Sequence, residues 1–187
     1  MEKVGVELFE KMLRGTQVYL EYGAGGSTVM AFTKGVPEIH SVDSDYRLLS
    51  LLEKKNQADA AKTSFRSYYA DIGPTREWGF PSSMESSDKW ILYASKVWWI
   101  LFKNQIHPDL ILIDGRFRVA CFLISCFLSR IGTYILFDDY YDRKHYSIVE
   151  SYIKPNQRAG RMALFKKTKQ ISPLSIIHII LFRKDFR

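Results

Sequence analysis

The sequence is poor in the features that mark secreted and membrane proteins. It has two cysteines among 187 residues, Cys121 and Cys126, and they lie close together inside one apolar run. That spacing suits one helix in a reducing compartment better than a disulfide framework. The most apolar stretches, at residues 97–102, 119–128 and 176–182, are shorter than the about 18 residues that a membrane span needs. With no basic segment leading into an apolar one at the start, we expect a cytoplasmic protein.

What the chain does have is enough apolar material for one ordinary core. Hydrophobic residues make up 47% of the sequence and aromatic residues 14%, a composition that argues against disorder. We therefore expect a single domain over residues 1–187. The formal net charge of +7 favours anionic partners, although the basic excess is local and forms no polybasic run.

Short apolar runs alternate with longer segments of helical character. This alternation predicts an α/β protein with a doubly wound, mostly parallel sheet covered on both faces. Two strands in succession at the end predict an antiparallel finish. The expected strands are 18–22, 38–42, 65–70, 109–113, 133–137, 162–166 and 176–182, and the expected helices are 6–13, 27–32, 46–55, 88–102, 119–131 and 145–153.

Each of the first five expected strands is followed by glycine or aspartate. In open sheets of this kind, ligands bind outside the carboxyl ends of the strands. The set therefore indicates a binding site along one sheet edge, although Asp and Gly are also common turn and capping residues. The residues are Gly23, Asp43, Asp71, Asp114 and Asp138.

A glycine-rich segment after the first strand gives the strongest motif. It reads Glu-Tyr-Gly-Ala-Gly-Gly-Ser-Thr from Glu21 to Thr28. A dinucleotide fingerprint would place its third glycine at Thr28, and a carboxylate at Glu21 would repel a pyrophosphate. The same carboxylate suits a cationic amine, which favours S-adenosylmethionine over NAD. The residues expected to bind the cofactor here are Glu21, Gly23, Ala24, Gly25 and Ser27.

Two further acids extend the expected cofactor site. Asp43 ends the second strand, where a carboxylate accepts both hydroxyls of a ribose. It is also placed to cap the next helix, a task that Asp45 can perform instead. Asp71 and Ile72 follow the third strand, near the expected position of the adenine edge.

These residues resemble the class I S-adenosylmethionine-dependent methyltransferases over nearly the whole chain in element order. The resemblance rests on Leu-Glu-Tyr-Gly-Ala-Gly at residues 20–25, on Asp43 and on Asp71. It implies a Rossmann-like, seven-stranded sheet with an antiparallel C-terminal strand pair. A closer similarity, to a small bacterial subgroup of methyltransferase-like proteins of unassigned substrate, rests on residues 19–28, 71–75, 78–79, 114–118 and 137–140.

Three acids follow the fourth and fifth strands, namely Asp114, Asp138 and Asp139. Converging carboxylates repel one another unless a cation or proton lies between them, and hard oxygen ligands suit Mg²⁺. The pattern is similar to that of metal-dependent O-methyltransferases of the catechol and macrocin types. The alternatives are a metal-free site in which Asp114 lies near the transferred methyl group, and a capping role for the Asp138–Asp139 pair.

Basic residues near these acids are candidates for acceptor binding and catalysis. Arg116 and Arg118 follow Asp114 and match a carboxylate or phosphate in bidentate fashion, or else neutralise the acids without a metal. Lys144 and His145 are the nearest candidates for a general base. Trp78, in the long connection at 72–87, either covers a ligand or packs on the domain.

The resulting hypothesis is S-adenosylmethionine-dependent O-methylation of a small molecule or glycan, with or without magnesium. A nucleic-acid methyltransferase is the first alternative, favoured by the net charge, although no Asn-Pro-Pro-Tyr-type tetrapeptide is present to receive a flipped base. The second alternative is a cofactor-binding protein without catalytic activity. A homodimer would supply a missing wall of the acceptor site.

Overall fold

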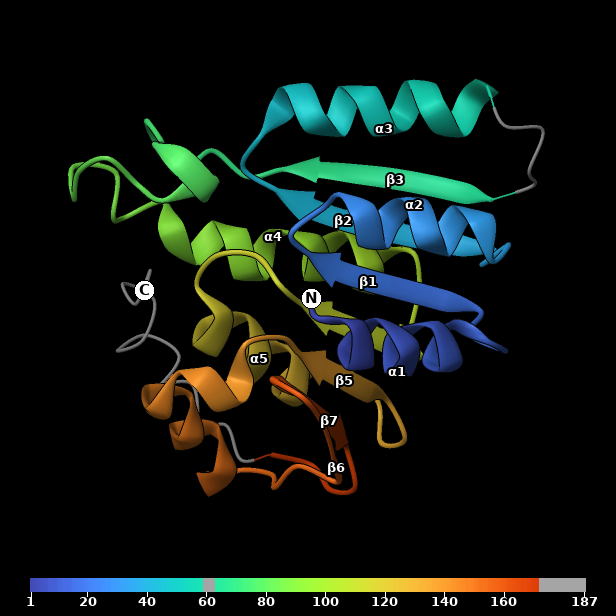
Figure 1. Cartoon of the computed structure of the whole chain (residues 1–187). Coiled ribbons are helices and arrows are strands. Elements are labelled where there is room, and N and C mark those ends of the chain that lie inside the picture. Colours follow the sequence, from blue (N-terminus) through green and yellow to red (C-terminus); the bar gives the residue numbers. More distant parts are fainter. Residues whose placement is uncertain (59–62, 172–187) are drawn as a thin grey trace.

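The computed structural model describes residues 1–58 and 63–171, and in them the chain forms one seven-stranded sheet (Figure 1). The strand order is β3-β2-β1-β4-β5-β7-β6. Strands β1 to β5 pair in parallel, and β7 runs antiparallel to both β5 and β6. The strands are β1 Val18–Tyr22, β2 Glu38–Asp43, β3 Ser64–Tyr69, β4 Leu110–Ile113, β5 Tyr134–Phe137, β6 Gln157–Ala159 and β7 Met162–Lys166.

Helices cover both faces of the sheet, as the alternating pattern predicts (Figure 1). The apolar residues of α1, α2 and α3 pack with one set of strand side chains, which includes Tyr19 and Ile39. Those of α4 and α5 pack on the opposite face with Leu20 and Tyr22. The helices are α1 Lys3–Leu13, α2 Gly26–Thr33, α3 Tyr46–Ala58, α4 Trp90–Lys103 and α5 Arg118–Leu128.

Two predicted elements differ from the structure. The helix expected at 145–153 is the 3₁₀ helix η3, Lys144–Ser151, which follows the shorter η2, Tyr140–Asp142. The antiparallel pair is confirmed in kind, but β7 pairs with β6, a strand that the sequence did not predict. Strand β6 is three residues long and two of them are exposed, so no apolar run announces it. The strand predicted at 176–182 lies outside the described residues.

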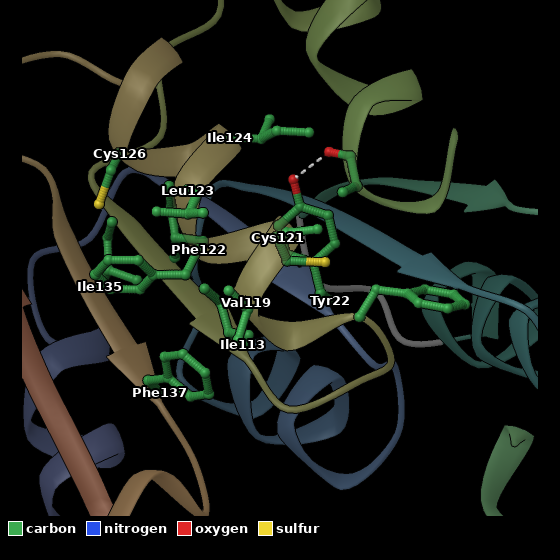
Figure 2. Close-up of a cluster of buried hydrophobic side chains, with 14 of the residues drawn as sticks. Tyr22, Ile113, Val119, Cys121, Phe122, Leu123, Ile124, Cys126, Ile135 and Phe137 are labelled. Atoms are coloured by element: carbon green, nitrogen blue, oxygen red, sulfur yellow. Dashed lines mark hydrogen bonds between the residues drawn. The ribbon is translucent and has the colours of Figure 1, made fainter. Parts of the chain in front are cut away.

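Helix α5 forms the centre of the larger core cluster (Figure 2). Both cysteines lie on it, free and buried, which confirms the single helix that their spacing predicts. Burial raises the pKa of both thiols. At the same cluster, the hydroxyl of Tyr22 donates to the carbonyl oxygen of Ala94 at 2.8 Å and accepts the indole N–H of Trp98 at 2.8 Å. The end of β1 is thereby held against α4.

The strand order reverses between β1 and β4, and the turns after these two strands touch. Gly23 has φ +96°, and a Cβ on it would lie 2.6 Å from the amide nitrogen of Gly115. A Cβ on Gly115 would lie 2.2 Å from the hydroxyl of Tyr93. Only glycine fits at either position, so main chain meets main chain at the switch point where open sheets bind ligands.

None of the helices within residues 1–58 and 63–171 is long and apolar enough to span a bilayer.

Candidate active-site cleft

A cleft of about 1400 Å³ opens at the carboxyl ends of the parallel strands. A pocket for one small ligand is typically about 300–1,000 Å³, so this cleft has room for a cofactor and an acceptor together. Predicted site residues that line it include Gly23, Ala24, Ser27, Asp43, Asp114, Arg116, Asp138 and Asp139. Their side chains come from four strand ends, which meet as the alternating pattern predicts.

The β1–β2 half of the cleft is built from main chain and one carboxylate. Asp43 accepts the amide N–H of Ala24 at 2.8 Å and that of Asp45 at 2.8 Å. Burial raises the pKa of Asp43, and these amide hydrogen bonds oppose the rise. The carboxylate is fixed against the glycine-rich turn and faces the cleft. This is the position expected of a carboxylate that accepts the hydroxyls of a ribose.

Glu21 lies behind this turn and does not line the cleft. Its buried carboxylate accepts hydrogen bonds from four hydroxyl groups, those of Tyr19, Ser27, Thr28 and Ser41. Burial raises its pKa, and the bonds from Ser27, Ser41, Thr28 and Tyr19 oppose the rise in that order. The predicted contact between Glu21 and a ligand amine is therefore not what the structure offers. Glu21 instead fixes Ser27, which does line the cleft.

The other residues predicted at the cofactor end divide in the same way. The amide of Gly25 donates to the hydroxyl of Thr28 at 2.9 Å and closes the turn. Asp71 and Ile72 lie outside the lining of the cleft. Asp71 is half exposed and pairs with Lys89 at 2.8 Å, while Ile72 is buried and its carbonyl oxygen accepts the indole N–H of Trp90 at 2.9 Å.

At the β4–β5 half, the acids come together as predicted, but cations lie among them. Arg118 is buried, and its guanidinium is 3.1 Å from Asp114 and 3.4 Å from Asp139. Arg161 is 3.3 Å from Asp139. The terminal ammonium of Met1 is 3.5 Å from Asp138.

This arrangement does not fit the predicted magnesium site. Within the described part of the chain, no group of three or more His, Cys, Asp or Glu side chains is placed to hold a metal ion. One oxygen each of Asp138 and Asp139 lacks a hydrogen bond, and the Asp139 oxygen already faces Arg161. The alternative weighed from the sequence, neutralisation by arginine, is what the structure shows for Arg118.

Asp114 has the electrostatic setting of a proton acceptor. Burial raises its pKa to about 6, with a further contribution from Asp138, and Arg118 opposes the rise. At neutral pH it is therefore a carboxylate whose proton affinity lies close to the ambient pH, the range that suits a general base.

Comparisons with known proteins show the family to which the chain belongs. The chain is 32% identical to a methyltransferase-like protein from Silicibacter pomeroyi DSS-3, and the structures match with a TM-score of 0.86 over 98% of this chain and 95% of that one. The chain belongs to this methyltransferase-like family. A candidate caffeoyl-CoA O-methyltransferase from Staphylococcus aureus shares the fold at 11% identity, with a TM-score of 0.55 over 89% of this chain and 84% of that one. No family model and no curated protein matches the chain.

In the present chain, the two residues predicted as general bases lie away from the cleft. Lys144 and His145 are exposed on η3, and neither lines the cleft. The ring of His145 packs against that of Tyr146 at 4.4 Å between centroids. Their place near Asp139 in the sequence therefore does not bring them into the lining of the cleft.

The cleft is also lined by residues that sequence reasoning missed. Phe80 lines the cleft and lies 4.2 Å from the guanidinium carbon of Arg116. Arg143 and Arg161 line it from segments without a recognisable motif. The segment carrying Trp78 is closed by a bridge between Thr75 and Pro81, and Trp78 stands 85% exposed at the cleft with φ +60°.

Proposed function

We propose that this protein is an S-adenosylmethionine-dependent methyltransferase that transfers a methyl group to a hydroxyl of a small molecule or glycan. The observation that carries the proposal is the crossing of Gly23 and Gly115 beside the carboxylate of Asp43. A ligand can approach the main chain there, and the carboxylate suits vicinal hydroxyls better than phosphates. Membership of the methyltransferase-like family supports methyl transfer as the reaction.

The residues present fit this cofactor. Gly23 and Ala24 offer main-chain contact, and Asp43 offers lone pairs to a ribose. When bound, S-adenosylmethionine supplies an electrophilic methyl group on a positively charged sulfur. Much of the remaining work in methyl transfer is alignment of the acceptor oxygen, to which a confining cleft contributes strongly.

Asp114 is the residue placed to take the proton from the acceptor hydroxyl. It lies directly after β4 and lines the cleft, and Arg118 holds it at 3.1 Å. A carboxylate with a pKa of about 6 is ionised at neutral pH and still basic enough to receive a proton. No step in this proposal passes through a metal ion, because the acids are paired with cations.

Calorimetric titration with S-adenosylhomocysteine tests the cofactor assignment. We expect the chain to bind S-adenosylhomocysteine and to ignore NAD under the same conditions. Binding of NAD alone, or of neither compound, would remove the proposal. Methyl transfer to a panel of hydroxylated small molecules and glycans then tests the reaction class.

A nucleic-acid acceptor is the second candidate, and the positive net charge is the observation that favours it. Such binding would weaken steeply as salt is added. Retention of RNA on a filter, lost between low and high salt and accompanied by methylation of the RNA, would replace the small-molecule assignment. Cofactor binding without turnover on either panel would indicate a non-catalytic role.

A further inference from the structure

Building on the proposed function, we infer that the methyl acceptor carries an oxyanion, a carboxylate or a phosphate, and that Arg116 binds it. The family assignment and the reaction class leave the acceptor open. The arrangement of charges at the β4–β5 half of the cleft narrows it.

Arg116 is a half-buried arginine without a carboxylate partner. Among the described residues, its guanidinium makes no ion pair and no hydrogen bond, and its central carbon lies over the ring of Phe80, 4.2 Å from the ring centroid. Arg118 and Arg161, on the same wall, each lie within 3.5 Å of a carboxylate. A guanidinium stacked by one face keeps its N–H donors along the edge, where a planar or tetrahedral oxyanion is bound in bidentate fashion.

The cations around Arg116 also favour the binding of an anion in this part of the cleft. Arg143 lines the same cleft, and its only acidic neighbour among the described ion pairs is Asp139, at a long 3.9 Å. Burial lowers the pKa of Arg116, and the positive charges of Arg118 and Arg143 lower it further. A partly desolvated cation beside other cations is unfavourable until a ligand brings compensating negative charge.

The position of Arg116 also indicates that the bound anion belongs to the methyl acceptor. Arg116 stands two residues after Asp114, and its own amide donates to the hydroxyl of Tyr93 at 3.3 Å. An oxyanion on its edge therefore anchors a molecule beside the proposed base.

The test uses simple probes on the full chain. Phenyl phosphate, benzoate and neutral benzyl alcohol are titrated by NMR, with and without saturating S-adenosylhomocysteine. We expect at least one anion to bind about tenfold more tightly than the alcohol, the scale of one charge-assisted hydrogen bond pair. The two anions distinguish phosphate from carboxylate.

Three variants locate the binding. Arg116→Gln is expected to remove the preference for anions and Phe80→Leu to reduce it, while Arg66→Gln, at an exposed position on β3 outside the cleft, leaves it intact. Arg116→Lys retains the charge and part of the preference. Affinity for S-adenosylhomocysteine stays unchanged in the Arg116 variants.

Several outcomes would overturn the inference. These are equal affinity for the anions and the alcohol, a preference that survives in Arg116→Gln, or an equal loss in Arg66→Gln, which would indicate diffuse charge. Tight, salt-sensitive RNA binding that depends on Arg66 as much as on Arg116 would do so as well. Absence of S-adenosylhomocysteine binding defeats the proposed function separately, since the anion titration without it still reports on Arg116.

Discussion

The two halves of the cleft are built by different means. At the ends of β1 and β2, Gly23, Ala24 and Asp43 form the wall through the close approach of Gly23 to the main chain of Gly115 and through the amide hydrogen bond from Ala24 to Asp43. At the ends of β4 and β5, the wall is made of charged groups from separate segments of the chain, such as Asp139 with Arg161 and Asp138 with the terminal ammonium of Met1. The first half is fixed by backbone shape, and the second by a balance of charges.

This difference predicts how each half responds to substitution. A main-chain wall tolerates no added atom at its closest approach, so its failures should be severe and tied to geometry. A charged wall loses one interaction at a time, so its failures should depend on pH and on the identity of the ligand. The following experiments separate the two kinds of failure.

Gly23→Ala should have the largest effect. The new Cβ would lie 2.6 Å from the amide nitrogen of Gly115, in a backbone of φ +96°. Because overpacking and positive φ each cost about 1–3 kcal/mol, we expect affinity for S-adenosylhomocysteine to fall about a hundredfold or more in calorimetry. Gly15→Ala is the matched control, since Gly15 has φ +85° with nothing within 4 Å of its added Cβ. Equal loss of binding in both variants would contradict the role of the crossing.

Asp114→Asn should lower the turnover rate about a hundredfold, the contribution typical of a general base. In the native chain the carboxylate is the active form, so the rate should rise with pH up to about 6 and level off above it. The variant should lack this acid limb. Asp142→Asn, at an exposed acid that does not line the cleft, is the control. An acid limb that persists in Asp114→Asn would assign the base elsewhere.

Asp43→Asn should weaken S-adenosylhomocysteine about tenfold or more, because one amide N–H loses its charged acceptor and the ribose loses a carboxylate. Asp71→Asn should leave the affinity unchanged, since Asp71 pairs with Lys89 outside the cleft. Calorimetry on the two variants side by side measures the difference. Similar losses in both would return Asp71 to the cofactor site.

Removal of divalent metals should have no effect. Dialysis against a chelator, followed by a rate measurement with and without added magnesium, should give the same turnover, because Arg118 and Arg161 already face the acids. A rate that depends on magnesium and is lost in Asp139→Asn would restore the metal site.

The contrast between the halves also explains what sequence reasoning could find. Runs of apolar residues and the glycine turn are local signals, and they predicted the first five strands and the placement of Gly23 and Asp43 in the cleft. Glu21 shows the limit of such signals. The glycine motif predicted a ligand contact for Glu21, but its four hydroxyl partners come from β1, β2 and the start of α2, and they hold its carboxylate in the interior.

At the charged half, the sequence predicted the acids and not their partners. Asp114, Asp138 and Asp139 follow strands, so their meeting could be expected. Arg161 reaches them from the turn before β7, and nothing in its neighbourhood marks it. The stack of Phe80 on Arg116 likewise joins two segments that lie far apart in the sequence.

The backbone crossing at Gly23 and Gly115 has a consequence for how such a protein diversifies. No side chain separates the two turns. The spacing between the β1–β2 half and the β4–β5 half of the cleft is therefore set by the fold itself and not by any replaceable side chain. Substitutions among the arginines and aromatic residues at the β4–β5 half can then change which molecule binds there, while the distance between the two halves stays the same.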